Sequence, residues 1–514
     1  MRVATPDHDR FRLRRFVERL AAEGDAIRID REIALADLAL EIESTPKAVW
    51  LQKVGPERLE LVAGVSGERA RIAKAFECDA RELRAEIALR LSRPQEVVET
   101  ASSEAPVHAR ILTGEDIDLT RLPFYLQHEF DAGPYISSAI DFSLDPASGK
   151  RNIGCRRLML RSKTTCRTNL TNRSDLRSIY LAALERREPL PVSFAIGSHP
   201  IDFMAGVLRA PGDEFAVLAA LRGAPTAFVR GASNGVLAPA DTEIILEGYL
   251  DAEGYREMDG PYGEFWGYYG PMHLDPVFHV TAIAMRSDAL HQSVAHGGRR
   301  SALMETNQMS AIACELAASR ALASAGIEPA ALFSPPGATL FQSIRVALRQ
   351  GQRARAREAI AVLFKTPGFK QVVVVDDDVD IFDEQEIHWA MSTRFRGDRD
   401  LVVAGGLPAF YEDPTADAAG AAKTGFDLTA PGGWPANIQQ RRTAAPIVKT
   451  SGSARLLEAL ARGPMYFADL MRQTGSRDGR ELAVELGDLC ERGRLKRLPE
   501  GEYALIEESG TSSR

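Results

Sequence analysis

Cysteine is scarce in this sequence of 514 residues, and long apolar runs are missing. Its five cysteines are scattered and form no CxxC pair, which argues against a zinc ribbon and against a disulfide framework. No stretch reaches the roughly 18 uncharged apolar residues that a membrane-spanning helix requires. The N-terminal residues are polar and lack the apolar core of a secretory signal. We therefore expect a cytoplasmic protein with reduced thiols and no membrane segment.

Several signatures of catalysis and binding are missing as well. The sequence has no GxxxxGK[ST] phosphate loop, no HExxH zinc motif and no GxSxG nucleophile elbow. The glycine-rich stretch at 260–270 does not fit GxGxxG followed by a helix, so a Rossmann site is not expected. The net charge of −8 argues against a dedicated nucleic-acid binder, and nine dispersed histidines argue against a polyhistidine metal site.

The helix and strand patterns predict a mixed α/β fold. A chain of 514 residues should form several domains, because a single core rarely grows past about 250–300 residues. Helix and strand patterns alternate over residues 1–105 and predict a small α/β domain. Strand signals dominate residues 106–305, with helices near 175–186 and 213–222, and indicate a mixed barrel or curved sheet. Strand and helix patterns alternate from about 305 to 400 and predict a second α/β layer domain, residues 306–450. Its last part, 403–450, is rich in glycine, proline and alanine and is expected to run over the surface.

The last segment, 451–514, has a pattern of its own. Three short helices precede two strands joined by a turn, which is typical of a winged-helix fold. The third helix would read DNA, but it carries four acidic side chains, Glu481, Glu485, Asp488 and Glu491. Repulsion from phosphates makes a packing or dimerisation module the preferred interpretation.

The densest chemistry lies in the stretch 241–270, where Asp259 and Glu264 flank Gly-Pro-Tyr-Gly. A tight turn there would let both carboxylates point into one cavity. Two carboxylates in a dry pocket cannot both ionise cheaply, so one is expected to have a raised pKa and to donate a proton. The aromatic neighbours expected to keep the pocket dry are Tyr262, Phe265, Trp266, Tyr268 and Tyr269. The alternative is a glycine-rich turn with solvated acids.

A second cluster, 151–175, gathers arginines and asparagines on a predicted strand pair. Cationic and amide groups suit an anion such as a carboxylate or a cofactor phosphate. A solvated basic face is the alternative. Glu214 begins a predicted helix, where an acid stabilises the N-terminal dipole, so helix capping is its simplest interpretation from the residues alone.

Taken together, these segments resemble the UbiD-type decarboxylases, which use prenylated FMN. The resemblance covers about residues 10–450. It is carried by the phrases GEDIDLTRLP, DAGPYI, NIGxxR (152–157), LPVSFAIGSHP (190–200), EIILEGYL…DGPYGEFWGYYG, VVVVDDDVDIFDEQEIHWAMSTRF (372–395) and GFDLTAPGGW (425–434), which keep the family's order. It implies an N-terminal α/β domain, a central split β-barrel that binds the flavin, and a C-terminal α/β domain. The tail after about residue 450 lies outside it.

The resemblance also implies an activity and a site. The activity is reversible, non-oxidative decarboxylation of an aromatic, heteroaromatic or α,β-unsaturated acid. Arg157 would hold the substrate carboxylate, Glu264 would donate the proton, and Asp259 would complete the catalytic network. Asn152, Asn172 and Glu214 would bind a divalent metal, usually manganese, with K⁺ as a further candidate ion. The implied cofactor-binding residues are Asn152, Cys155, Arg156, Arg157, Thr168, Asn169, Leu170, Asn172, Arg173, Ser174 and Glu214.

Two departures from the family pattern stand out. Asn172 occupies a position where histidine is expected, and an amide oxygen is a weaker metal ligand than imidazole. Asp259 replaces a glutamate, and one fewer methylene shortens its reach towards Arg157 by roughly 1.5 Å, which can slow catalysis. A second hypothesis is therefore a weakly active or inactive flavin-binding or scaffold subunit of a larger carboxylase-type assembly.

Substrate choice and partners are less visible in the sequence. The segment 290–306 concentrates basic side chains, and His291, His296 and Arg300 are candidates to read a second polar group of the substrate. An exposed interdomain loop is the alternative. The resemblance further implies a flavin prenyltransferase as cofactor supplier and a homodimer or higher homo-oligomer.

Overall fold

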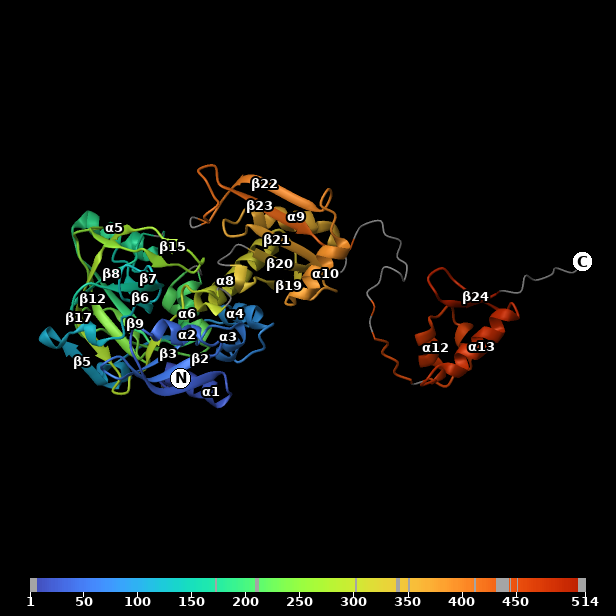
Figure 1. Cartoon of the computed structure of the whole chain (residues 1–514), viewed down its shortest axis with the longest axis horizontal. Coiled ribbons are helices and arrows are strands. Elements are labelled where there is room, and N and C mark those ends of the chain that lie inside the picture. Colours follow the sequence, from blue (N-terminus) through green and yellow to red (C-terminus); the bar gives the residue numbers. More distant parts are fainter. Residues whose placement is uncertain are drawn as a thin grey trace, which may run out of the picture. The chain divides into compact units, whose positions relative to one another are not determined.

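The computed structural model describes residues 7–171, 173–208, 212–300, 303–338, 343–349, 352–410, 413–430, 443, 445–450 and 452–506. The chain forms two compact units, residues 1–430 and 431–514 (Figure 1). The finer boundaries at 105, 305 and 450 stay predictions. No helix of the described part is both long enough and apolar enough to cross a membrane.

A closed six-stranded antiparallel barrel lies at the centre of the first unit. Its strands, in the order in which they pair around the ring, are β12 (Ile244–Leu250), β9 (Leu190–Ile196), β6 (Tyr135–Leu144), β7 (Arg151–Leu160), β8 (Thr165–Thr168) and β17 (Val277–Met285), and β17 returns to β12. β5 (Arg110–Thr113) adds to the outer part of β17. The register slips at Gly248 of β12, where a Cβ would lie 2.0 Å from the carbonyl oxygen of His279. Only glycine allows the two strands to approach so closely.

Three helices interrupt the barrel strands, as the sequence predicted for two of them. They are α5 (Asp175–Arg186), α6 (Pro200–Val207) and α7 (Glu214–Arg222). The Ser174 side chain accepts a hydrogen bond from the Arg177 backbone amide and so caps α5. Arg222, the last residue of α7, is buried between the carboxylates of Asp202 and Asp241, with one contact of 2.7 Å to each. A small sheet of β4 (Val97–Thr100), β10 (Thr226–Arg230) and β11 (Leu237–Pro239) lies beside these helices.

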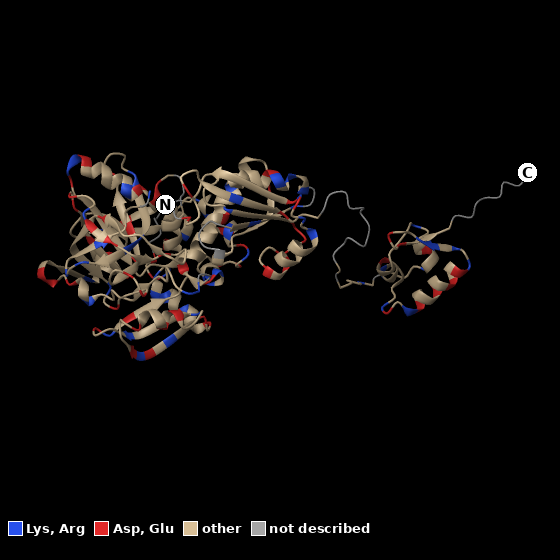
Figure 2. Ribbon diagram, turned by 45° about the horizontal axis from the view of Figure 1, so that its top comes forward, with Lys and Arg blue, Asp and Glu red and all other residues tan. Residues whose placement is uncertain are grey.

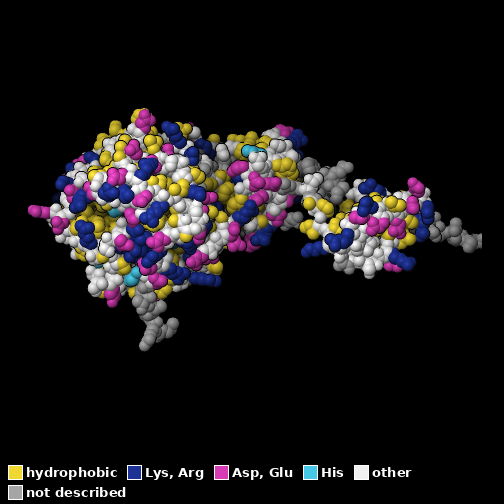
Figure 3. All heavy atoms as spheres, turned by 60° about the horizontal axis from the view of Figure 1, so that its bottom comes forward, with side chains coloured by type: hydrophobic (Ala, Val, Ile, Leu, Met, Phe, Trp, Pro, Cys, Tyr) yellow, Lys and Arg dark blue, Asp and Glu magenta, His cyan; other side chains and the backbone are white. Residues whose placement is uncertain are grey.

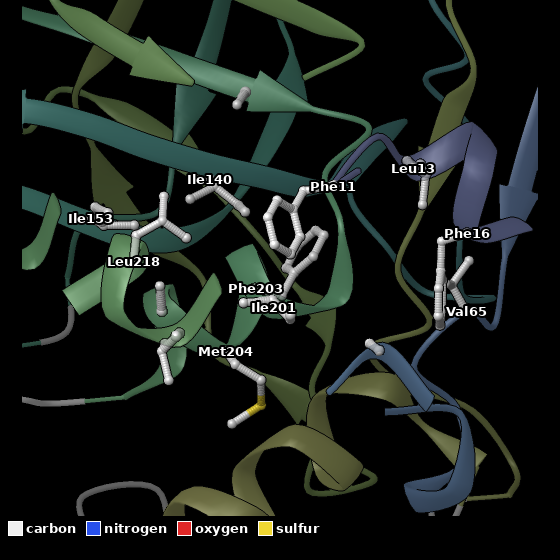
Figure 4. Close-up of a cluster of buried hydrophobic side chains, with 14 of the residues drawn as sticks. Phe11, Leu13, Phe16, Val65, Ile140, Ile153, Ile201, Phe203, Met204 and Leu218 are labelled. Carbon is white, nitrogen blue, oxygen red and sulfur yellow. The ribbon is translucent and has the colours of Figure 1, made fainter. Parts of the chain in front are cut away.

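The N-terminal part is a four-stranded sheet with helices. The strands are β1 (Ala26–Ile33), β2 (Ala48–Val54), β3 (Leu59–Ala63) and, from much later in the chain, β18 (His291–Ser293). The helices are α1 (Leu13–Ala22), α2 (Leu38–Glu43), α3 (Arg69–Ala75) and α4 (Leu83–Leu91). Figure 4 shows the apolar core that joins this part to the barrel, with Phe11 near Phe203 of α6, and Leu218 of α7 near Ile153 of β7. Burial of these side chains fixes the barrel against the N-terminal sheet.

Residues 305–427 form a second α/β layer. The sheet has the order β19 (Pro329–Phe333), β20 (Ser343–Leu348), β21 (Gln371–Asp376), β23 (Ala421–Asp427) and β22 (Leu401–Leu407). Its helices are α8 (Glu305–Ser324), α9 (Ala356–Phe364) and α10 (Glu384–Arg394), and Figure 1 shows α9 packed on the sheet. The near-continuous apolar run in β21 fits a strand buried on both faces. The expectation that residues 403–450 run over the surface was wrong for β23, which pairs with β21, and for most of β22, which pairs with β23.

The second unit contains three helices and a two-stranded ribbon, as predicted from its sequence. These are α11 (Leu456–Leu460), α12 (Phe467–Thr474), α13 (Arg480–Glu491), β24 (Leu495–Arg497) and β25 (Tyr503–Leu505). They enclose a small apolar core of their own, which includes Leu470 and Leu486. α13 begins with the basic Arg480, and its other charged side chains are the acidic Glu481, Glu485, Asp488 and Glu491. Figure 2 shows charges of both signs on this unit. Charges of both signs are also interspersed over the face of the protein in Figure 3.

Candidate active site

The candidate site is built where β7 faces two short ribbons that follow β12. The first ribbon pairs β13 (Glu257–Asp259) with β16 (His273–Asp275), and the second pairs β14 (Tyr262–Gly263) with β15 (Tyr269–Gly270). The turn between β13 and β14 carries Asp259 and Glu264 to the same side chain, Arg157 of β7. The two acids and the arginine that the sequence singled out therefore lie together.

Arg157 is the centre of this arrangement. Its Nη1 donates to Oε1 of Glu264 at 2.7 Å, and its Nη2 lies 3.7 Å from Oδ2 of Asp259. The guanidinium also lies over the Tyr262 ring, 4.4 Å from its centroid. Its Nε is buried and has no hydrogen-bond partner in the described protein. A buried donor of this kind is costly unless a ligand pairs with it.

Glu264 is ionised in this arrangement, contrary to the expectation of a raised pKa. Burial alone would raise the pKa of this carboxyl group, which is 7% exposed. The Arg157 guanidinium and His296, whose Nε2 is 3.3 Å from Oε2, outweigh burial and lower the pKa to about 2. The prediction that one of the two acids has a raised pKa treated them as an isolated pair and left Arg157 and His296 out. The expectation about the aromatic neighbours was also partly wrong, because Tyr268 and Tyr269 are exposed.

Asp259 is fully buried and is held mainly by neighbours other than Arg157. Its Oδ1 accepts hydrogen bonds from the Tyr135 hydroxyl at 2.5 Å and the Gly260 amide at 2.7 Å. Burial, and then the Asp259 charge, raise the pKa of Tyr135, so this phenol stays a donor. Oδ2 makes no hydrogen bond within the described residues, and its distance to Arg157 fits an ion pair without one. The missing methylene thus leaves a gap between Asp259 and Arg157.

Asn152 and Glu214 meet at the start of β7. One oxygen of Glu214 accepts a hydrogen bond from the Ile153 amide, so the carboxylate contacts β7 from its place in the first turn of α7. Burial raises the pKa of Glu214. The Asn152 amide nitrogen donates to the buried Asp141 at 2.7 Å, which leaves the amide oxygen as the atom available to a ligand. Asn172, the third predicted metal ligand, lies outside the described residues.

Thr168 ends β8, and Ser174 precedes α5. The Thr168 hydroxyl is fully buried and has no hydrogen-bond partner in the described structure. Ser174 accepts from Nη2 of Arg156 at 3.1 Å, and Arg156 in turn pairs with Asp141. Arg173 is exposed. An orphaned hydroxyl and oxygen ligands of two types suit a phosphate-bearing group with a hard divalent cation.

Close packing limits the space behind β7. The Cys155 thiol lies 3.8 Å from the Phe203 carbonyl oxygen, and burial raises its pKa to about 12, so it is a neutral wall. At Gly206 of α6 a Cβ would come within 2.8 Å of the Cys155 sulfur. On β7, Asn152 and Arg156 share one face, since both contact Asp141, and Arg157 lies on the other by strand alternation.

The three candidates for substrate recognition separate in the structure. His296 belongs to the site, because it contacts Glu264 and also lies 2.8 Å from the Thr306 hydroxyl. His291 does not: it lies on β18, contacts the Glu60 carbonyl, and is kept neutral by burial, which lowers its pKa to about 4. Arg300 is exposed and lines a separate surface hollow.

Sequence reasoning missed three contributors to the site. Tyr135 holds Asp259, and His273 contacts Arg157. Asp131 accepts from the Gly263 amide at 2.8 Å and so fixes the second ribbon. Asp131 and Tyr135 lie in the phrase DAGPYI, whose place in the resemblance was the available signal. His273 had no such signal.

Comparison with known proteins identifies the family. Residues 98–299 match the family model of the 3-octaprenyl-4-hydroxybenzoate carboxy-lyase Rift-related domain, and residues 311–428 match that of its C-terminal domain. The anhydromevalonate phosphate decarboxylase of Methanosarcina mazei is 32% identical over 317 residues, which are 61% of this chain and 72% of that relative. The chain belongs to the UbiD family and is a carboxy-lyase of this prenylated-FMN-dependent class.

Solved structures agree with this fold. The UbiD-class enzyme HmfF from Pelotomaculum thermopropionicum, in complex with FMN, superposes with a TM-score of 0.79 at 27% identity, covering 84% of this chain and 97% of that one. An evolved dimeric form of HmfF was solved with prenylated FMN, and its TM-score is 0.75 at 26% identity over 85% of this chain and 97% of that one. The 3,4-dihydroxybenzoic acid decarboxylase from Enterobacter cloacae shares the fold, with a TM-score of 0.76 at 23% identity over 86% and 98% of the two chains.

Proposed function

We propose that this protein binds prenylated FMN and reversibly decarboxylates an aromatic, heteroaromatic or α,β-unsaturated acid, with Arg157 holding the carboxylate and Glu264 donating the proton. The observation that carries the proposal is the buried cluster in which Arg157 binds Glu264 while its Nε has no hydrogen-bond partner among the residues that the structure describes. Membership of the family supports the reaction class, and the flavin complexes of HmfF support the cofactor.

The residues that would hold the cofactor lie on both sides of β7. Asn152 and Glu214, with Asn172, would bind a divalent cation, which we expect to be manganese. Thr168, with its unpaired hydroxyl, is the first candidate for the phosphate-bearing group. The remaining candidates for this binding surface are Cys155, Arg156, Asn169, Leu170, Arg173 and Ser174. When bound, the prenylated flavin supplies the electron sink that makes loss of carbon dioxide feasible.

Arg157 orients the acid through its carboxylate. Its unpaired Nε offers a donor, and the face of Tyr262 limits where the guanidinium can move. A second carboxylate on Arg157 competes with Glu264 for the same positive charge. Once that contact is given up, burial raises the pKa of Glu264, and the group can carry a proton. Glu264 then protonates the carbon that has lost carbon dioxide.

Asp259 and Tyr135 complete the network around the arginine. Asp259 keeps a negative charge near Nη2, which opposes complete withdrawal of Arg157 towards the substrate. The Tyr135 hydroxyl fixes the orientation of Asp259, so the acid need not reorient during the reaction. His296 provides a neighbouring polar group to Glu264 and is the candidate for substrate contact that the geometry supports.

The test is to produce the chain together with a flavin prenyltransferase and to measure bound cofactor and carbon dioxide release. Glu264→Gln should retain the flavin absorbance and lose about 10²–10⁴-fold in turnover, the usual contribution of a general acid. Turnover at the level of the unsubstituted chain would refute the assignment of the donor. A chain that takes up neither the flavin nor manganese would favour the scaffold hypothesis.

We also infer a homo-oligomer, in line with the dimeric form of HmfF. Light scattering of the full chain tests this directly. A monomer at micromolar concentration would contradict it.

A further inference from the structure

The ribbon of β13 and β16 places a histidine beside the catalytic arginine. In its register Asp259 lies opposite His273, and Glu257 lies opposite Asp275. Alternation puts these four side chains on one face, and Met258 and Leu274 on the other, where both are exposed. The polar face is turned to β7, since Arg157 contacts both Asp259 and His273.

His273 connects the arginine to the loop beside the cofactor residues. Its Nε2 lies 3.4 Å from Nη2 of Arg157 and 3.3 Å from the side-chain nitrogen of Asn169. An arginine can only donate, so Nε2 must be the acceptor and the proton of the neutral ring sits on Nδ1. Nδ1 lies 3.1 Å from Oδ2 of Asp275, which is an ion-pair distance, although neither atom makes a hydrogen bond within the described residues. The contacts of Nε2 therefore favour the neutral imidazole with its proton on Nδ1.

Asp275 is the anchor of this histidine. It is fully buried, and its Oδ1 accepts from the Leu170 backbone amide at 2.9 Å. The carboxylate thus cannot turn away from the ring without losing this bond. Through Asp275 and Asn169, the position of His273 depends on residues 169 and 170, which belong to the proposed cofactor-binding loop.

A metal ion is the other chemistry that this group of residues suggests. Ligand atoms of Asp259, His273 and Asp275 lie within 4.8 Å of one another. Arg157, however, already lies 3.7 Å from Oδ2 of Asp259 and 3.4 Å from the imidazole. A permanent positive charge at that distance opposes a second cation. The facing atoms Oδ2 of Asp259, Nδ1 of His273 and Oδ2 of Asp275 make no hydrogen bond within the described residues, so it is the charge of Arg157 that disfavours a metal here.

We propose that His273, held by Asp275, is a positioning residue that keeps Arg157 set to receive the substrate carboxylate, and that it does so only as the neutral imidazole. Protonation would turn Nε2 into a donor that faces the donors of Arg157 and Asn169. It would also place a positive charge beside the guanidinium. This role of His273 rests on the proposed function of Arg157 as the group that holds the substrate carboxylate.

The charges around His273 bring the protonation of its imidazole into the physiological pH range. Burial alone would lower the pKa of the imidazole, but Asp275 and then Asp259 outweigh burial and the repulsion from Arg157, so the pKa is raised above its usual value of about 6.5. Carboxylate binding should therefore weaken as the pH falls through this raised value. The falling acid side of the profile of kcat/KM should follow it, because that ratio reports the free enzyme.

Two substitutions test the proposal. His273→Gln keeps an acceptor at the position of Nε2 but cannot be protonated, so the acid limb should disappear while activity at higher pH is retained within about threefold. Asp275→Asn removes the charge beside the ring and lowers its pKa, so the acid limb should move at least about one pH unit lower. Glu257→Gln is the matched control, because Glu257 lies on the same face but pairs with Arg161 and Arg167.

The measurements are the pH profile of kcat/KM and the affinity for benzoate between pH 5 and 9, with thermal unfolding as a check on the fold. An acid limb that is unchanged in both His273→Gln and Asp275→Asn would overturn the inference. So would a limb that shifts equally in Glu257→Gln. Benzoate binding separates this inference from the proposed function: a pH dependence of binding that His273→Gln abolishes supports the role of His273 even if no acid is decarboxylated.

Discussion

The exchange of partners at Arg157 makes a quantitative prediction about protons. The free protein holds Glu264 ionised against the guanidinium, with a pKa of about 2. A carboxylate ligand that takes over Arg157 removes the charge that stabilises this anion. Glu264 must then take up a proton from solvent. Binding of a carboxylate near pH 7 should therefore consume on the order of one proton for each ligand bound.

The size of the effect follows from the contact itself. Two unit charges separated by the 2.7 Å between Nη1 of Arg157 and Oε1 of Glu264 attract each other by about 6 kcal/mol at an effective dielectric constant of about 20. Raising the pKa from about 2 to neutrality requires about 7 kcal/mol, at 1.36 kcal/mol for each unit. The free energy lost with the arginine contact, together with burial of the carboxyl group, is thus comparable to the free energy that this rise in pKa requires.

Calorimetric titration of benzoate measures the uptake. The observed heat depends on the ionisation enthalpy of the buffer in proportion to the protons exchanged, so two buffers at one pH suffice. The titration should be done at a pH above the pKa of His273, so that the imidazole stays neutral and contributes nothing to the measured proton uptake. Glu264→Gln should abolish the uptake, and Glu257→Gln should preserve it. Heats that do not depend on the buffer, or an uptake that persists in Glu264→Gln, would refute the exchange.

Three further predictions concern the scaffold. Arg222→Leu leaves Asp202 and Asp241 buried without a counter-charge and should cost about 3–5 kcal/mol of stability, seen as a lower thermal midpoint; an unchanged midpoint would contradict it. Gly248→Ala should abolish folding of the barrel, because no Cβ fits at 2.0 Å from a neighbouring carbonyl oxygen, and a soluble variant with normal circular dichroism would show otherwise. Removing residues 451–514 should leave decarboxylase activity unchanged, since these residues lie in the separate second compact unit, and a large loss of activity would assign the tail a catalytic role.

Local patterns carried much of the architecture. The helices predicted near 175–186 and 213–222 appear as α5 and α7, because their apolar spacing and end signals are contained within a dozen residues. Closure of the barrel was not predictable in the same way. It requires β17 to pair with β12 and β8 at once, and no periodicity within one strand specifies its partners. The resemblance implied a split barrel, and the order of its strands was not predicted.

In the site, too, local sequence patterns predicted single residues, whereas contacts between distant residues were missed. Arg157 and Glu264 were each recognised, but their contact spans 107 positions, so the charge that lowers the pKa of Glu264 was left out of the prediction. His273 was missed because its partners Arg157 and Asn169 lie 116 and 104 positions away. Spacing in the sequence revealed Asp259 and Glu264, which share a turn, but not His273, whose partners Arg157 and Asn169 lie in other segments of the chain.

The alternating faces of the β13–β16 ribbon constrain how this segment can change in evolution. A slip of one residue would turn Asp259 and His273 to solvent and bring Met258 and Leu274 against Arg157. Such a protein would keep its barrel but lose the contacts of Asp259 and His273 with Arg157, and with them its activity. Insertions and deletions within 257–259 or 273–275 can therefore survive only in steps of two residues. Length variation among working relatives should accordingly be confined to the connections outside these two strands.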